Sequence, residues 1–233
     1  MDVIALLPHL HLFRFPVGQA YLWSDGEEST LIDAGPVGSG RVIAEALTAL
    51  GRAPGAVRRI VLTHFHEDHA GGAGEFAALS GAEVLAHPLD APFVRGELAG
   101  PPPRLVEWER PLHAAALAAL PEDRPVPPRA VTGVPDGAVL DFGGGARVVH
   151  VPGHTDGSIA LFLPDQGVLF TGDTVAASPV DGTVIPGVFN LDRPRLLDSL
   201  GRLAGLDADV ACFGHGDPVV GDAAAALRGA AAG

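Results

Sequence analysis

Hydrophobic and polar residues alternate over short distances in the first third of the chain, a pattern typical of β-strands. Breaks in the alternation coincide with Pro8 and with the turn sequence Asp25-Gly26. Between residues 38 and 50 the apolar positions change to helical spacing, and Gly51 follows as a stop. We therefore predict strands at 3–7, 10–15, 20–24, 29–33, 59–62 and 83–86, and helices at 38–50 and 69–79.

Residues 88–135 differ from the preceding residues in composition and in predicted secondary structure. Proline clusters at 101–103 and 125–128 flank a single predicted helix at 105–120. Pro111 is expected to kink that helix or to divide it. Strands are predicted again at 139–142, 147–151, 159–163, 168–171 and 209–213, with helices at 193–203 and in the Ala-rich tail. Similar elements recur in the two halves. We therefore predict one domain over residues 1–233, made of two βα halves, with chemistry on loops at one edge and a helical lid or insertion at about 88–135.

Composition narrows the class of protein. Hydrophobic residues make up 47% of the 233 residues, enough for a sizeable core, and the formal net charge is -13. Such a charge repels phosphate backbones and anionic membrane surfaces, so we expect neither nucleic acid nor a membrane as partner. The single cysteine, Cys212, excludes an intrachain disulfide and lies in a predicted apolar strand. No apolar run approaches about 18 residues and no signal peptide is recognised, so a cytoplasmic location is expected.

The strongest chemical motif follows the predicted strand 59–62, where the chain reads Thr63-His64-Phe65-His66-Glu67-Asp68-His69. Three histidines and an aspartate within six residues form a donor set suited to zinc, manganese or iron. The strand-to-helix turn lets alternate side chains face one point, while Asp68 and His69 face a second. We interpret this cluster as a metal site, because a merely solvated turn would not need so many histidines.

Three further metal-capable side chains each follow a predicted strand and lie among glycines. They are His154 in Pro152-Gly153-His154, Asp173 in Thr171-Gly172-Asp173, and His215 in Gly214-His215-Gly216. Each fragment alone is more typical of a turn or a helix cap. Together they repeat one design, a donor on a Gly-flanked strand end.

These motifs resemble those of the metallo-β-lactamase fold hydrolase superfamily, over nearly the whole chain. The resemblance implies an α+β fold, the αββα sandwich, in which two mixed sheets pack face to face with helices on the outer faces. It implies one metal ion held by His64, His66 and His154, a second held by Asp68, His69 and His215, and Asp173 bridging both. Asp33, in Leu31-Ile32-Asp33-Ala34-Gly35, would orient the ligand loop by hydrogen bonds.

Departures from the subfamilies leave the substrate open. Many true β-lactamases of this fold carry Cys or Ser where Asp173 stands. Glyoxalase II and persulfide dioxygenases usually carry Gly-Cys-Gly-Arg after the bridging aspartate, and residues 174–182 lack it. A group of acyl-homoserine lactonases places Tyr where this chain has Ala176. The chain is therefore not assigned to any of these groups.

The expected reaction is hydrolysis of an ester, lactone or thioester by attack of a metal-bound hydroxide on the carbonyl. Two divalent ions, zinc first and iron or manganese as alternatives, would lower the pKa of a shared water towards roughly 7. Asp68 is the expected catalytic side chain, orienting the hydroxide and shuttling a proton. An iron-dependent oxygenase of thiols or persulfides and a non-catalytic binding protein of the same fold remain alternatives.

The segment at 88–135 is predicted to form an apolar wall of a small-molecule pocket. Phe93 and Trp108 would supply that wall, and Phe189 would close the opposite side. A long segment without regular structure is uncommon in compact domains and is often functional. The alternative is a dimerisation arm that buries its apolar face against a second copy of the chain.

Overall fold

The computed structural model describes residues 1–233, which divide into two compact units. The first unit comprises residues 1–100 and 114–134, and the second comprises residues 101–113 and 135–233. Each unit contains one large β-sheet and its own helices. None of the helices is long and apolar enough to span a membrane.

The first unit is organised by a seven-stranded mixed sheet in the order β1-β2-β3-β4-β5-β6-β7. Strands β1 to β4 pair antiparallel, and β4 to β7 pair parallel. The strands are β1 (Asp2–Leu7), β2 (Leu10–Arg14), β3 (Gln19–Asp25), β4 (Glu28–Ile32), β5 (Val57–Val61), β6 (Glu83–Ala86) and β7 (Thr132–Gly133).

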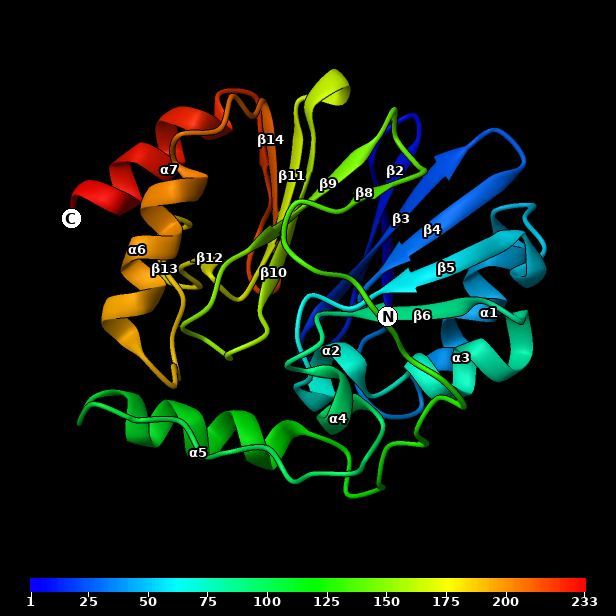
Figure 1. Ribbon diagram of the computed structural model, residues 1–233, viewed down its shortest axis with the longest axis horizontal. Helices are drawn as coiled ribbons and strands as arrows, with labels where there is room; N and C mark the ends of the chain where they lie inside the picture. The colour runs from blue at the N-terminus through cyan, green and yellow to red at the C-terminus, as the bar shows by residue number, and fades with distance from the viewer. The chain divides into compact units, whose positions relative to one another are not determined.

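Helices α1 (Ser39–Ala49) and α3 (Ala73–Ser80) lie side by side in this unit (Figure 1). Their apolar faces close a core in which Ile43, Leu47 and Phe76 pack with sheet residues such as Leu31 and Ile60. Two single-turn helices, α2 (Glu67–Ala70) and α4 (Ala91–Val94), and a 3-10 turn at Pro54–Ala56 complete the unit. The core thus fixes the positions of β4 and β5, and metal-capable or carboxylate side chains follow the carboxyl ends of both strands.

The second unit has a six-stranded sheet in the order β15-β14-β11-β10-β9-β8. Only β11 and β14 pair parallel, and the other neighbours are antiparallel. The strands are β8 (Val139–Leu140), β9 (Ala146–His150), β10 (Ile159–Leu163), β11 (Val168–Gly172), β14 (Val210–Phe213) and β15 (Val219–Val220). A 3-10 turn at Pro164–Gln166 joins β10 to β11.

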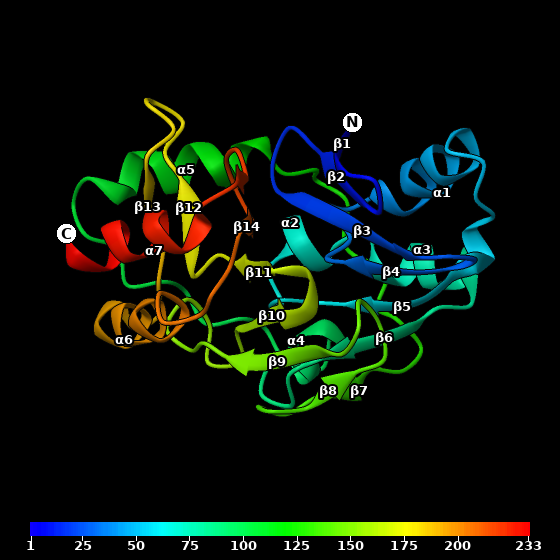
Figure 2. The same ribbon diagram turned by 90° about the horizontal axis from the view of Figure 1, so that it is seen from above.

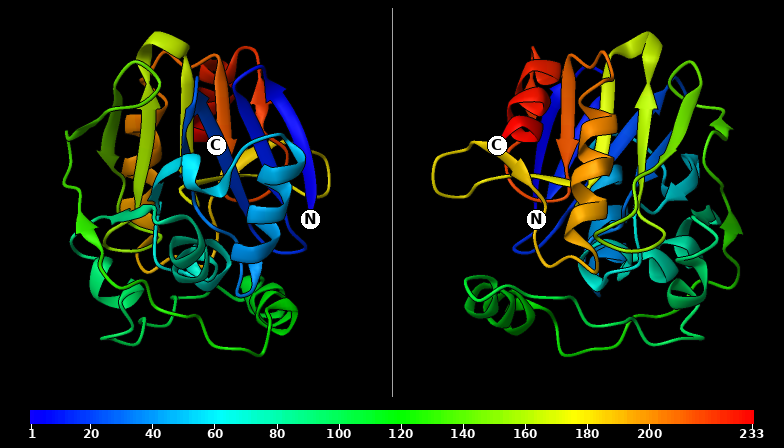
Figure 3. Two further views of the ribbon diagram at one scale, coloured as in Figure 1. Left: turned by 90° about the vertical axis from the view of Figure 1, so that its right-hand side faces the viewer. Right: turned by 60° about the vertical axis from the view of Figure 1, so that its left-hand side comes forward.

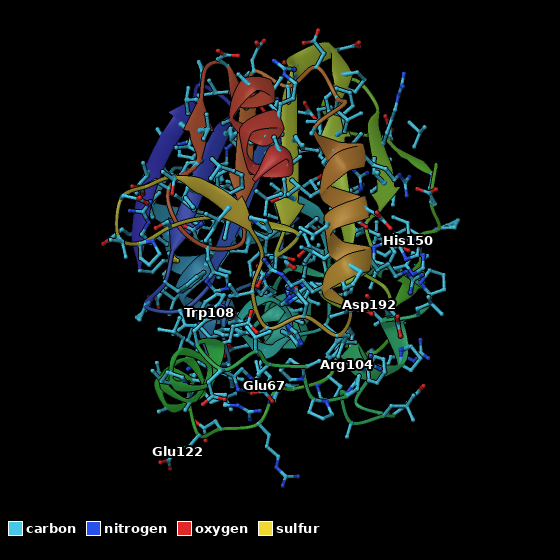
Figure 4. The ribbon with its side chains drawn as sticks, turned by 90° about the vertical axis from the view of Figure 1, so that its left-hand side faces the viewer. Glu67, Arg104, Trp108, Glu122, His150 and Asp192 are labelled. Atoms are coloured by element: carbon cyan, nitrogen blue, oxygen red, sulfur yellow. The ribbon has the colours of Figure 1, made fainter.

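Helices α6 (Arg193–Leu203) and α7 (Ala223–Ala232) are neighbours in this unit (Figure 2). Leu200, Leu203 and Leu227 pack into a core with Leu169 and Phe213. Asp192 caps α6, because its Oδ1 accepts a hydrogen bond from Arg195 N at 3.1 Å, and Figure 4 shows Asp192 at the end of that helix. A two-stranded sheet of β12 (Val175–Ala177) and β13 (Val184–Pro186) carries a loop that extends away from the large sheet (Figure 3).

Two predicted helices differ from those observed. The helix expected at 69–79 is divided into α2 and α3, because Gly72 N donates to Gly35 O at 3.0 Å and so leaves the helical hydrogen-bond ladder. The helix expected at 105–120 is α5 (Glu109–Ala119), which crosses the boundary between the units. Pro111 neither kinks nor divides α5, because it lies in the first turn, where a backbone N–H is not needed.

Candidate functional site

Four metal-capable side chains gather in the first unit just beyond β5, and we call His64, His66, Asp68 and His69 the first donor set. The ring centroids of His64 and His66 are 4.8 Å apart, and those of His64 and His69 are 4.3 Å apart. Asp68 Oδ2 lies 3.5 Å from His69 Nε2. His66 is extended and precedes α2, so the chain turns sharply enough for all four side chains to cluster.

Asp33 anchors this set from the end of the neighbouring strand β4. Its Oδ1 accepts a hydrogen bond from Thr63 N at 2.7 Å, and its Oδ2 accepts one from Thr63 Oγ1 at 2.8 Å. The same Oδ2 lies 2.9 Å from His69 Nδ1. Asp33 has a positive φ of 58°, a conformation that aspartate tolerates better than most residues. One buried carboxylate therefore fixes both the turn and the ring of His69.

The same hydrogen bonds define the protonation of His64. Thr63 Oγ1 lies 3.1 Å from His64 Nδ1. Because the Thr63 hydroxyl donates its hydrogen to Asp33, its oxygen accepts a hydrogen from His64 Nδ1. His69 donates its Nδ1 hydrogen to Asp33 in the same way. Both imidazoles then carry their ring lone pair on Nε2, the arrangement that metal-binding histidines need.

Three more donors come together in the second unit, and we call His154, Asp173 and His215 the second donor set. They follow β9, β11 and β14 respectively. Parallel pairing of β11 with β14 places Gly172 opposite Phe213, which brings Asp173 and His215 to the same edge of the sheet. Asp173 Oδ2 lies 3.5 Å from His154 Nε2 and 3.3 Å from His215 Nε2.

The loop after β13 orients His154. His154 Nδ1 lies 3.1 Å from Val188 O and 3.3 Å from Asn190 Oδ1, so that nitrogen donates and Nε2 faces Asp173. Asn190 Nδ2 in turn donates to Gly187 O at 2.8 Å, which fixes its amide. Gly187 packs on the carbonyl of Asp173, where any Cβ would overlap it. The loop thus locates both His154 and the backbone of Asp173.

The donor spacing fits a divalent metal. Zinc–nitrogen bonds of about 2.0–2.1 Å in a tetrahedron place neighbouring ligand atoms about 3.3–3.4 Å apart. The distances from Asp68 to His69, and from Asp173 to His154 and to His215, are 3.3 to 3.5 Å and lie at or just beyond this spacing. Imidazole and carboxylate donors suit zinc, iron or manganese. Cys212 is not among the donors, because it is buried within β14, and burial raises the pKa of its thiol.

The three residues predicted to line a substrate pocket lie in different units. Phe93 lies in α4 of the first unit, with its ring centroid 4.6 Å from that of Phe65, and lines a pocket of about 550 Å³ there. Trp108 and Phe189 belong to the second unit. Trp108 precedes α5 and is 54% exposed (Figure 4), and Phe189 packs its ring 5.0 Å from that of His113. The wall formed by all three residues stays a prediction.

Several contributing residues were not predicted from the sequence. Thr63 belongs to the histidine motif, but no role was predicted for it. A hydroxyl next to a ligand histidine can hydrogen-bond the ring, so this role could have been predicted from the sequence. Asn190 and Glu109 act through backbone and ring contacts with residues far along the chain, as in the 3.3 Å bond from Phe189 N to Glu109 Oε1. No local pattern announces such contacts.

Comparison with known proteins agrees with this chemistry. The metallo-beta-lactamase superfamily model matches residues 14–215. The chain is 31% identical to the probable metallo-hydrolase YflN of Bacillus subtilis, over 85% of this chain and 79% of that protein. It is 29% identical to the hydroxyacylglutathione hydrolase of Rhodobacter capsulatus, over 84% of this chain but only 61% of that protein.

Among solved structures, the metallo-beta-lactamase family protein TTHA1429 of Thermus thermophilus is similar, with a TM-score of 0.70 and 30% sequence identity. The match covers 98% of this chain and 78% of that one. The predicted fold class is confirmed, because the chain has two large mixed sheets with helices and matches the fold of this solved structure. On the family match and this identity, the chain belongs to the metallo-beta-lactamase superfamily.

Proposed function

We propose that this chain is a dinuclear metal-dependent hydrolase of carbonyl substrates, acting on thioesters, esters or lactones. The observation that carries the proposal is the position of Asp173, whose Oδ2 lies within 3.5 Å of His154 Nε2 and 3.3 Å of His215 Nε2. A carboxylate between two imidazoles is suited to bridging two cations. The proposed ligands are His64, His66 and His154 for one ion, Asp68, His69 and His215 for the other, and Asp173 for both.

When bound, divalent ions polarise a carbonyl oxygen and lower the pKa of water. The protein's own part is to hold the donors and to move the proton. Asp33 and Thr63 hold His64 and His69 in one tautomer, so that no reorganisation is needed before the reaction. Asp68, whose side chain is 15% exposed, takes the proton lost by the attacking water and returns it to the leaving group.

Thioesters come first among the substrates. Several relatives of this chain at about 30% identity are hydroxyacylglutathione hydrolases, whose name describes thioester hydrolysis. This chain spans only 61% and 56% of the length of two of them, so the glutathione part of that substrate is not carried over. The proposal therefore concerns the acyl transfer to water and leaves the thiol unspecified.

Metal analysis combined with a matched substrate panel tests the proposal. The protein is stripped with a chelator, reloaded with zinc, manganese or iron, and assayed on an ester, a lactone and a thioester of one acyl group. We expect two ions per chain and hydrolysis of at least one substrate, both lost in His215→Ala and both retained in His9→Ala. Absence of bound metal, or iron-dependent oxygen uptake with a persulfide and no hydrolysis, would overturn it.

A further inference from the structure

A pocket of about 550 Å³ lies within the first unit, framed by residues 65–71, 93–100 and 124–128. Its walls are mostly apolar, with Phe65, Phe93, Leu98 and Val126 among the lining residues. Leu98 and Val126 are 57% and 60% exposed, so the pocket opens to solvent. This volume is within the range of about 300–1,000 Å³ that small-molecule sites occupy.

Close backbone packing preforms the pocket. Gly74 of α3 lies against the carbonyl of Val126, and Gly100 lies against the ring of Phe65. A Cβ on Gly96 would stand 3.3 Å from Pro127 Cγ. The contacts of Gly100 and Gly96 connect the framing segments to one another, and the contact of Gly74 holds the third segment against α3, where a Cβ would overlap the carbonyl of Val126. Prolines at 125, 127 and 128 further restrict the third segment, so the walls need little ordering when a ligand binds.

Three polar side chains line the same pocket, namely His66, Glu67 and Arg124. His66 belongs to the first donor set. Glu67, in the first turn of α2 (Figure 4), carries a negative charge. Arg124 is the only Lys or Arg side chain in the lining, and its guanidinium has no acidic partner. Arg95, in contrast, donates to both carboxylate oxygens of Glu97 at 2.7 and 2.8 Å.

We propose that this pocket is the acyl subsite, and that it selects acyl groups with an apolar chain and one terminal carboxylate. The apolar walls take the chain, and Arg124 pairs with the carboxylate. Glu67 disfavours a second anionic group, which makes polyanions poor substrates. The inference rests on the proposed function, because His66 places the subsite next to a metal ligand and hence next to the scissile carbonyl.

Two thioesters that differ only in the terminal group provide the kinetic test. The S-ethyl thioester of octanoic acid is compared with the mono-S-ethyl thioester of octanedioic acid. We expect kcat/KM about tenfold higher for the carboxylated substrate, as a charge-assisted hydrogen bond allows. Arg124→Ala should remove this preference by lowering kcat/KM for the carboxylated substrate about tenfold. The matched control is Arg129→Ala, because Arg129 is exposed and lies outside the pocket lining. This variant should keep the preference for the carboxylated substrate.

A second variant tests the apolar walls. Val126→Trp should fill the pocket and raise KM for both eight-carbon substrates about tenfold, a larger increase than for an acetyl thioester, whose acyl group is too short to fill the pocket. The control is Val42→Trp, at a half-exposed position on α1 of the same unit. It should leave KM for both eight-carbon substrates unchanged. If Val126→Trp instead turns a dimer into a monomer with KM unaltered, the apolar surface is an interface between copies of the chain and the inference is wrong.

Calorimetric titration with octanedioate separates this inference from the proposed function, because it needs no catalysis. Binding that is lost in Val126→Trp and weakened in Arg124→Ala supports the subsite even if no thioester is hydrolysed. In that case only the hydrolase proposal fails. Hydrolysis that ignores chain length and charge, with octanedioate binding equal in all variants, would overturn the subsite and leave the hydrolase proposal standing.

Discussion

The two donor sets are built in opposite ways. All four members of the first set fall between residues 64 and 69, and Asp33 fixes the turn that carries them through one buried carboxylate. The three members of the second set are separated by 19 and 42 residues along the chain, from 154 to 173 and from 173 to 215. They meet only because β9, β11 and β14 belong to one sheet. The first set is therefore a local structure, and the second is a product of the whole unit.

The anchoring groups differ as well. His69 donates to a carboxylate, which raises the basicity of the ligand nitrogen, whereas His154 donates to a carbonyl and an amide oxygen. Exposure varies within both sets, since His69 is 0% and Asp68 15% exposed in the first, and His154 is 2% and His215 38% exposed in the second. Because its anchor is a charged carboxylate, we expect the first set to hold its ligand rings more rigidly than the second.

The largest effect is expected for Asp173→Ala, which removes the one side chain that contacts both other members of the second set. Mutation of residues that only hydrogen-bond the metal ligands lowers metal affinity or activity about 10–100-fold. Loss of a bridging carboxylate should therefore lower activity by more than about 100-fold. Metal content measured by elemental analysis should also fall. The control is Asp165→Ala, a change in the turn between β10 and β11. If Asp173→Ala keeps its full metal content and activity, Asp173 does not bridge the two metal ions.

Asp33→Asn is expected to rank next, with metal bound about 10–100-fold more weakly in competition with a chelator. Asparagine tolerates the positive φ at this position, so the change isolates the charge from the backbone strain. The amide oxygen of asparagine can still accept, but its NH2 group cannot, so Thr63 N, Thr63 Oγ1 and His69 Nδ1 are not all satisfied together. The free energy of unfolding of the metal-free protein should fall by about 1–3 kcal/mol for each donor left unpaired. Unchanged metal affinity would show that Asp33 has only a structural role.

The contrast between the sets also explains what could be predicted from the sequence. The first set is local, so the spacing of His64, His66 and His69 was enough to identify it. Helix α6 (Arg193–Leu203) was predicted at about 193–203, and the cap by Asp192 that begins it is a local feature of the chain. The second set was recognisable only through its Gly-flanked strand ends and a resemblance, since local spacing does not state which strands are neighbours.

Features that depend on tertiary contacts were missed or misplaced. The break between α2 and α3 arises from the bond of Gly72 to Gly35, 37 residues away, which helical periodicity cannot reveal. The short strands β12 and β13 lie in a stretch without clear alternation. The position of Arg124 in one pocket with Phe65 and Phe93 was not predicted either, because a proline-rich segment gives no indication of which distant residues share its pocket.

Glu109 connects the segment before α5 to the second donor set. Its side chain is buried, its Oε2 accepts from Val106 N at 3.0 Å and its Oε1 accepts from Phe189 N at 3.3 Å. Arg104 N donates to Asn190 O at 2.9 Å nearby. Phe189 has a positive φ of 59°, which a phenylalanine adopts only when the surroundings impose it. Glu109 therefore helps to hold the loop whose atoms orient His154.

Glu109→Ala should accordingly weaken metal binding to the second set by about 2–10-fold, the value of one ordinary hydrogen bond. This is the smallest of the expected effects, because Glu109 acts on His154 only through Phe189 and its neighbours. Glu109→Gln should restore much of the affinity, since its amide oxygen can still accept from Phe189 N. The control is Glu107→Ala, because Glu107 is 94% exposed and contacts only Arg110 among charged residues. A chelator competition in which Glu109→Ala and Glu107→Ala behave alike would show that the loop orients His154 without help from the segment before α5.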